Sequence, residues 1–163
     1  MQPDEKIQAH LVSVWRESKK FFSIGGREGM LVLTNTHLTF VHKTESKINW
    51  WKNITQRQVL NLLKSKSTMI HHDGYGEKEL SNDLDNIKNI ELEFDDIKKI
   101  SFKEETWGSA LNLEYEKDGK NENYQYAIAQ DWVKYPAKEP TKFMKVDWEP
   151  FVQYIKERQK FTK

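Results

Sequence analysis

Residues 26–43, GREGMLVLTNTHLTFVHK, contain two short apolar runs separated by the four polar residues TNTH. Each run carries apolar side chains at odd and even positions alike. Alternate residues of a strand point to opposite faces of a sheet, so a hairpin made from these runs has two partly apolar faces. The sequence therefore predicts a hairpin with one face in the core and the other covered by a further part of the chain.

Two tight turns predict the register of two hairpins. Asn35-Thr36 closes the hairpin above, and Asp118-Gly119 closes a second one within residues 111–128. Asp-Gly favours the turn type that joins antiparallel strands, and apolar residues alternate on both sides of it. The predicted opposite pairs are Leu33 with Leu38, Leu31 with Phe40, Val32 with Thr39 and Met30 with Val41 in the first hairpin, and Leu113 with Tyr124 and Leu111 with Tyr126 in the second.

Amphipathic helices are predicted near both ends of the chain. Residues 4–18 have apolar residues at helical intervals after Asp4, which is placed to cap a first turn. A second apolar stripe follows Asp147 at i, i+3, i+4 and i+7. The predicted apolar faces are Ile7, Leu11, Val14 and Trp15 in the N-terminal helix, and Trp148, Phe151, Val152 and Ile155 in the C-terminal helix.

Residues 46–89 differ in pattern from the strands on either side and are predicted to be a helical insertion between sheet elements. Thr55 and Gln58 are spaced as a capping box, and Val59, Leu62, Leu63 and Ile70 lie near one helical face. We expect the insertion to cover the outer face of the first hairpin, because Met30, Val32 and Val41 would otherwise form an exposed apolar patch.

Length and composition favour one domain over residues 1–163. The formal net charge is +1, so no overall attraction to nucleic acid or to anionic membranes is expected. The absence of cysteine excludes disulfides, thiolate catalysis and cysteine-ligated metals, and it agrees with a cytoplasmic protein. The polar N-terminus lacks the pattern of a signal peptide, and no apolar run has the roughly 20 residues of a membrane-spanning helix. We expect a cytoplasmic protein, with peripheral membrane association left open.

The apolar pattern resembles the GRAM branch of the pleckstrin-homology-like superfamily. In that family a strand of the form G-x-L-x-L-T leads to L-x-F, and a segment I-x-x-x-D-I-x-x-I carries the middle of the sheet. The resemblance covers residues 20–45 and 90–160, and the insertion and the N-terminal helix lie outside it. The matching positions are Gly29, Leu31, Leu33, Thr34, Leu38, Phe40, Ile97 and Ile100.

The resemblance implies an α+β fold: a bent antiparallel β-sheet, or partly open barrel, that the C-terminal helix closes at one end. The apolar stripe of that helix should then be buried. The resemblance also implies a non-catalytic binding or adaptor module, because such folds commonly bind lipid head groups, peptides or partner proteins. Fold alone does not fix function, so the ligand and the partner stay unidentified.

Two candidate contact sites follow. In phosphoinositide-binding relatives, basic residues around the first two strands bind phosphate, and Lys19, Lys20 and Arg27 occupy that region here. Glu28 and Gly29 stand where further basic residues would be expected, so a solvated sheet edge is the alternative. Trp50 and Trp51 have the amphipathic rings of a membrane or partner contact, or they pack the insertion onto the first hairpin.

Other candidate sites are weaker. His71, His72 and Asp73 are metal-ligand types, but adjacent histidines on an extended chain point in opposite directions, which favours a polar loop. The glycines at 25, 26 and 29 precede a β-like run, whereas a phosphate-binding loop precedes a helix, so we expect no cofactor.

Nucleic-acid binding and catalysis are not expected. Acidic residues interrupt the aromatic and lysine-rich stretch 132–145, and the chain has few arginines. The motifs of serine, cysteine and zinc hydrolases are absent. Two alternatives stay open: a small hydrolase whose carboxylates or His71 and His72 assemble in the insertion, and a homo-oligomeric scaffold protein that associates through the apolar outer face.

Overall fold

The computed structural model describes residues 4–18, 27–42, 48–72, 75–84, 89–130 and 143–161, with the backbone alone for residues 48–53, 77 and 160–161. Seven strands and three α-helices lie in these residues, together with one short 3-10 helix, η2. The elements are β1 (Ile7–Ser18), β2 (Arg27–Thr34), β3 (His37–His42), α1 (Ile48–Ser65), α2 (Glu77–Asp83), β4 (Ile90–Glu93), η2 (Phe94–Asp96), β5 (Ile97–Glu105), β6 (Gly108–Lys117), β7 (Lys120–Ile128) and α3 (Glu149–Phe161).

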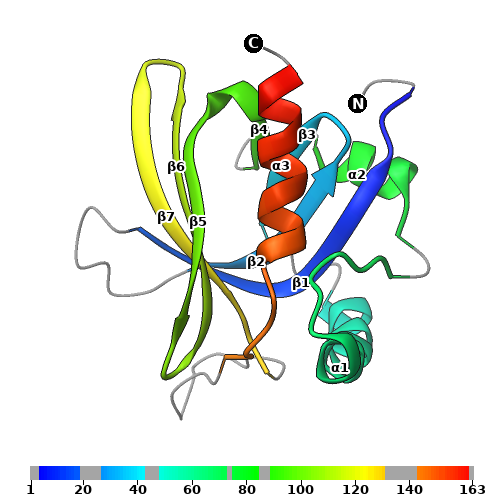
Figure 1. Ribbon diagram of the computed structural model, residues 1–163. Helices are drawn as coiled ribbons and strands as arrows, with labels where there is room; N and C mark the ends of the chain where they lie inside the picture. Colours follow the sequence, from blue (N-terminus) through cyan, green and yellow to red (C-terminus); the bar gives the residue numbers. More distant parts are fainter. Residues whose placement is uncertain are drawn as a thin grey trace.

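The strands form one antiparallel sheet in the order β4-β3-β2-β1-β7-β6-β5. The long strand β1 pairs with β2 on one side and, over Val14–Ser18, with β7 on the other, so it joins the two halves of the bent sheet (Figure 1). The edge strands β4 and β5 are linked by η2 but do not pair with each other. This open, bent antiparallel sheet with a C-terminal helix confirms the predicted α+β architecture.

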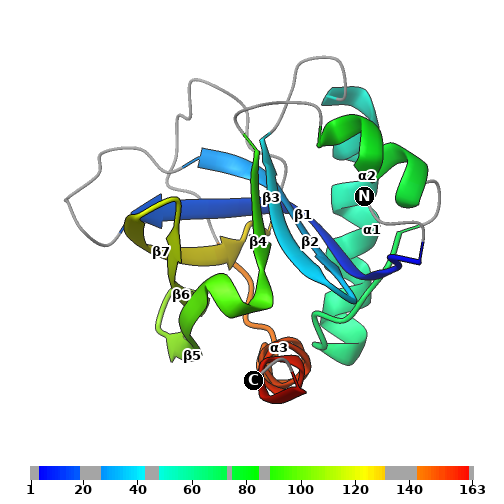
Figure 2. The ribbon, with the colours of Figure 1, turned by 90° about the horizontal axis from the view of Figure 1, so that it is seen from above.

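Helix α3 lies inside the bend of the sheet, as Figure 2 shows in a view along its axis. Its predicted apolar stripe is confirmed, because the four residues are at most 1% exposed and belong to the main core. Asp147 accepts a hydrogen bond from the backbone N–H of Glu149 at 2.9 Å, and so caps the first turn. The four buried residues are Trp148, Phe151, Val152 and Ile155.

Both predicted hairpin registers are confirmed. The outer face of the β2–β3 hairpin forms a second, smaller core with residues of α1, α2 and the segment between them. The insertion therefore covers this face, as predicted, and Figure 2 shows α1 and α2 on the side of β1 and β2 away from α3. The second core contains Val12, Met30, Val32, Val41, Ile54, Tyr75 and Leu80.

The predicted N-terminal helix over residues 4–18 is wrong, because residues 7–18 form strand β1. The register of β1 against β2 shifts between Leu11 and Val14, where Ser13 has a φ of 53°. The extra residue of this bulge puts Leu11 and Val14 in the same core although they are three positions apart. A bulged strand with both faces buried thus has the apolar spacing of a helix.

The predicted capping box at Thr55 and Gln58 is also wrong, because α1 begins seven residues earlier, at Ile48. Both side chains are buried in the middle of the helix and bond to β1. The amide of Gln58 accepts from the N–H of Val12 and donates to its C=O, each at 2.7 Å. These polar contacts set which face of α1 meets the sheet, so Leu63 is 65% exposed rather than buried.

Candidate functional site

The TNTH turn between β2 and β3 is held by a threonine hydroxyl. Thr34 Oγ1 accepts hydrogen bonds from the backbone N–H groups of Thr36 and His37, at 3.2 and 2.9 Å. The same hydroxyl donates to Glu5 Oε1 at 2.8 Å. A side chain thus supplies the contacts that stabilise this turn and also positions a carboxylate beside it.

The segment before β1 is fastened to this turn by Asn35. The N–H of Lys6 donates to Asn35 Oδ1 at 2.8 Å, and the N–H of Asn35 donates to the Lys6 C=O at 3.0 Å. Asn35 Nδ2 also donates to the Asp4 C=O at 3.3 Å. These bonds hold the backbone on both sides of Glu5 and so fix where its carboxylate lies.

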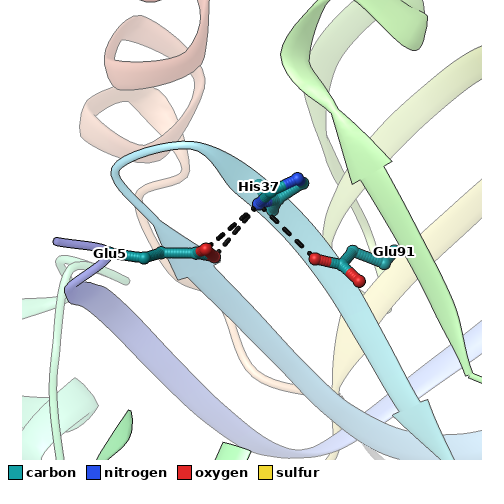
Figure 3. A group of neighbouring side chains, drawn as sticks. All are labelled: Glu5, His37 and Glu91. Atoms are coloured by element: carbon teal, nitrogen blue, oxygen red, sulfur yellow. Dashed lines mark hydrogen bonds and ion pairs between the residues drawn. The ribbon is translucent and has the colours of Figure 1, made fainter. Parts of the chain in front are cut away.

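Three side chains from separate segments converge at this point (Figure 3). His37 Nδ1 lies 3.0 and 3.3 Å from the two carboxylate oxygens of Glu5 and 3.5 Å from Glu91 Oε1. The hydroxyl of Thr36 is 2.9 Å from the same nitrogen. Glu5 is 2% exposed, whereas the side chains of His37 and Glu91 are 17% and 34% exposed. The group thus runs from a buried carboxylate to one that reaches solvent.

Glu5 is ionised at neutral pH despite its burial. Burial acts to raise the pKa of the carboxyl group, but hydrogen bonds from Thr34 and His37 favour the charged form and hold the pKa below its usual value. Among the described lysines and arginines, none forms an ion pair with Glu5. Its negative charge is therefore balanced by hydrogen bonds and by His37 only when that histidine is protonated.

A pocket of about 680 Å³ opens beside this group, between β4 and the β6–β7 turn. Lys117 lines the pocket, and its ammonium group donates a hydrogen bond to the backbone C=O of Glu91. Five carboxylates, two lysines and one histidine line the pocket. Its lining residues are His37, Glu91, Glu93, Asp96, Lys98, Glu116, Lys117, Asp118 and Gly119.

The charge of the pocket favours cationic ligands. Its carboxylates outnumber its ammonium groups, so phosphate and other anions are repelled while cations gain Coulomb energy. The volume lies within the roughly 300–1,000 Å³ that is usual for ligand pockets, but polar side chains predominate in the lining. The pocket therefore offers ionic contacts and hydrogen bonds rather than an apolar cavity.

The predicted phosphate site is only partly described. Lys19 and Lys20 lie outside the described residues, and Arg27 is an exposed residue at the start of β2, opposite Arg16 of β1. Gly29 has no room for a side chain, because a Cβ atom there would lie 2.6 Å from the ring of Phe40. A basic residue at position 29 is therefore excluded by packing.

A further arginine, Arg16, lies opposite Arg27 and has no signature in the sequence that predicts a contact role. Arg16 is 8% exposed, and its guanidinium group lies 4.7 Å from the ring centroid of Phe40 and 4.4 Å from that of Tyr124. Burial raises the pKa values of Tyr115 and Tyr126 in the same part of the core. Because the arginine is enclosed by aromatic rings, its role in this structure is packing.

The other predicted contact residues stay untested. The backbone of Trp50 and Trp51 belongs to the first turns of α1, but their side chains lie outside the described residues. His71 is exposed, whereas His72 is 4% exposed and lies 3.0 Å from the amide oxygen of Gln58. The two histidines thus do not share a site, and Asp73 is not described.

Glu5, His37 and Glu91 are not predicted as site residues from the sequence. His37 stands out in the sequence only as one of the four polar residues TNTH, and Glu91 belongs to no recognisable motif. The residues come from three distant segments, and no short motif links them. The local sequence signal for these residues is the alternation of the two strands. His37 and Glu91 occupy outward positions, next to Leu38 and Leu92, whose side chains belong to the core.

Comparisons with known proteins give fold-level likenesses. No family model and no curated protein matches the sequence. One similar solved structure is the "Vps36 N-terminal PH domain", with 14% identity, a TM-score of 0.49, and coverage of 100% of this chain and 86% of that chain. Another is "The hSac2 domain from human phosphoinositide phosphatase Sac2", with 13% identity, a TM-score of 0.44, and coverage of 100% and 73%. Likenesses this distant do not bear on ligands.

Among the described helices, none has the length and apolar composition needed to cross a membrane.

Proposed function

We propose that the protein is a non-catalytic binding module that docks a partner protein through the acidic pocket between β4 and the β6–β7 turn. The observation that carries this proposal is the excess of carboxylates around an open pocket of about 680 Å³. The chemistry that fits it is a segment of the partner rich in lysine or arginine. Such a segment presents flexible ammonium or guanidinium groups that form charge-assisted hydrogen bonds with carboxylates.

The charge of this pocket favours a basic protein segment over a membrane. Phospholipid head groups present phosphate, which the pocket carboxylates repel. The basic residues Lys19, Lys20 and Arg27 belong to a different part of the chain, around the end of β1 and the start of β2. A membrane-binding function would therefore use another surface, and the two functions are separable by experiment.

Exposed ionic contacts are individually weak. Each pair at a solvent-exposed site is worth about 0.2–1 kcal/mol, so several must act together. Charge complementarity of this kind speeds association and selects among partners, and salt weakens it. We therefore expect binding that falls steeply with ionic strength.

The test uses a fluorescent peptide of alternating lysine and glycine, with fluorescence anisotropy as the readout at low and at physiological ionic strength. Glu93 and Glu116 are exposed residues of the pocket. The double substitution Glu93→Lys and Glu116→Lys should abolish peptide binding. The matched control, Glu104→Lys with Glu157→Lys, makes the same change in net charge at exposed residues that do not line the pocket, and should retain binding.

Two results would overturn the proposal. Equal losses in the two double variants would mean that overall charge, and not the pocket, holds the peptide. Binding of the wild-type protein to phosphatidylserine-containing vesicles without peptide binding would favour the membrane alternative. In that case Arg27→Glu should release the protein from the vesicles.

A further inference from the structure

We propose that Glu5, His37 and Glu91 form a binding site for a divalent transition-metal ion, with Zn²⁺ as the best fit to the ligand types. The site has one imidazole and two carboxylates from three segments of the chain, and two of the three residues line the acidic pocket. This inference goes beyond partner docking and does not depend on it.

The geometry of the three side chains matches metal ligation. In a tetrahedral zinc site the ligands lie about 2.0–2.2 Å from the metal, which places them about 3.3–3.6 Å from one another. His37 Nδ1 is 3.0 Å from Glu5 Oε1 and 3.5 Å from Glu91 Oε1. One ligand atom from each residue lies within 4.8 Å of the other two. A metal ion therefore fits among the three atoms with small movements of the side chains.

The ligands are held in place before any metal arrives. The hydroxyl of Thr34 donates to Glu5, and Asn35 fixes the backbone on both sides of that residue. His37 and Glu91 stand on the paired strands β3 and β4. Outer contacts that orient the ligands are a regular part of metal sites, and strands position them more sharply than loops do.

The buried charge of Glu5 is an independent observation in favour of a cation. Buried charges in proteins are paired or coordinate metals, because an isolated one has a high desolvation cost. Glu5 is 2% exposed and, among the described residues, has His37 as its ion-pair partner. When His37 is neutral, as a metal ligand must be, no described lysine or arginine forms an ion pair with either carboxylate. A divalent ion supplies the missing charge.

The pocket connects the proposed metal site to solvent. His37 and Glu91 both line it, and Glu93, Asp96, Glu116 and Asp118 add negative potential, against Lys98 and Lys117. A metal at Nδ1 replaces the 2.9 Å contact of this nitrogen with Thr36. With three protein ligands, a tetrahedral ion keeps one further position, which water fills.

The mixed ligand set decides the class of metal. Mg²⁺ and Ca²⁺ prefer oxygen ligands alone, whereas imidazole suits Zn²⁺ and its neighbours in the first transition series. A site with one nitrogen and two carboxylate oxygens therefore selects the transition metals. Ca²⁺ and Mg²⁺ should bind there far more weakly.

The test is titration of the full chain with Zn²⁺ by isothermal calorimetry. We expect binding of one ion, with affinity reduced more than about tenfold by His37→Asn and by Glu91→Gln. Two matched controls should bind like the wild type: His71→Asn, at an exposed histidine, and Glu104→Gln, at an exposed carboxylate outside the pocket. Circular dichroism checks that each variant is folded.

A second measurement needs no variant. In protein labelled with ¹⁵N, Zn²⁺ should shift the ring nitrogens of His37, while Mg²⁺ should not. Absence of Zn²⁺ binding, unshifted His37 resonances, or equal losses in the ligand and control variants would each overturn the site. Failure of the basic peptide to bind, with Zn²⁺ binding intact, would overturn the docking function alone.

Discussion

The β2–β3 and β6–β7 hairpins supply their inner faces to one core, but their outer faces differ. All residues of β2 from Glu28 to Thr34 are buried, since α1 and α2 cover the outer side. In β7 the residues before Tyr126 are exposed or half-buried, and burial alternates along much of β6. A continuous apolar run thus marks a strand covered on two faces, and an alternating run marks one covered on a single face.

The turns of the two hairpins differ in the same way. Asp118 and Gly119 have φ values of 53° and 76°, which lie in the left-handed region. A two-residue turn with this backbone conformation joins twisted antiparallel strands directly. The TNTH turn has no residue of positive φ and is held by the Thr34 hydroxyl and by the segment that contains Glu5. The late hairpin is determined locally, whereas the first depends on distant parts of the chain.

The largest expected effect is on the covered outer face. Val32→Asp places a charge without a partner between β2 and the insertion, where Val32 is fully buried. We expect a loss of more than about 4 kcal/mol in the free energy of unfolding, measured by denaturant titration. Asn121→Asp, at an exposed outward position of β7, should change it by less than about 0.5 kcal/mol. A tolerated Val32→Asp would mean that the outer face is open.

The next effect concerns the core that both hairpins share. Phe151→Ala removes a ring that is 0% exposed and should cost about 3–5 kcal/mol. Gln153→Ala, on the exposed side of the same helix, should cost less than about 0.5 kcal/mol. Denaturation midpoints of the two variants measure the difference. Equal midpoints would contradict the placement of α3 inside the bend.

A smaller loss is expected where α1 meets β1. Gln58→Ala leaves the N–H and C=O of Val12 buried without their partner, at a cost of about 1–3 kcal/mol. The neighbouring residue Arg57 is exposed, and Arg57→Ala serves as the control. Amide hydrogen exchange at Val12 should speed up in the Gln58 variant alone. An unchanged exchange rate at Val12 would show that the contact with α1 does not stabilise the bulge in β1.

The smallest effect is at the turn of the late hairpin. Gly119→Ala forces an alanine to a φ of 76°, although nothing lies within 4 Å of a Cβ atom there. The cost is then strain alone, about 1–2 kcal/mol. Lys120→Ala, one residue further, should be neutral within about 0.5 kcal/mol. If Gly119→Ala has the thermal unfolding midpoint of the wild type, the conformation of this turn is not determined by its own residues.

Where sequence reasoning failed, contacts made in the folded state were responsible. The residues of β1 have helical spacing because a bulge at Ser13 shifts the alternation by one position. Thr55 and Gln58 look like a helix cap, but their side chains pair with β1 from the middle of α1. Both errors come from the contact between β1 and α1, where polar side chains replace the regular backbone pairing of a strand.

The candidate site was beyond the reach of local patterns. Glu5 is 32 residues from His37 in sequence, and the two meet because Asn35 and Thr34 fasten the first segment to the hairpin turn. Each of these side chains has an ordinary role in its own segment. Their convergence follows from strand order and register, which place β3 beside β4 and the segment before β1 beside the turn.

The sequence by itself determined the registers of both hairpins, the covered outer face and the apolar stripe of α3, because each depends on the periodicity of neighbouring residues. The tertiary structure decided the bulge in β1, the face of α1 that is buried, and the meeting of Glu5, His37 and Glu91. These features depend on hydrogen bonds and charges between segments far apart in the chain. Such contacts exist only once the sheet has brought the segments together, so local sequence does not encode them.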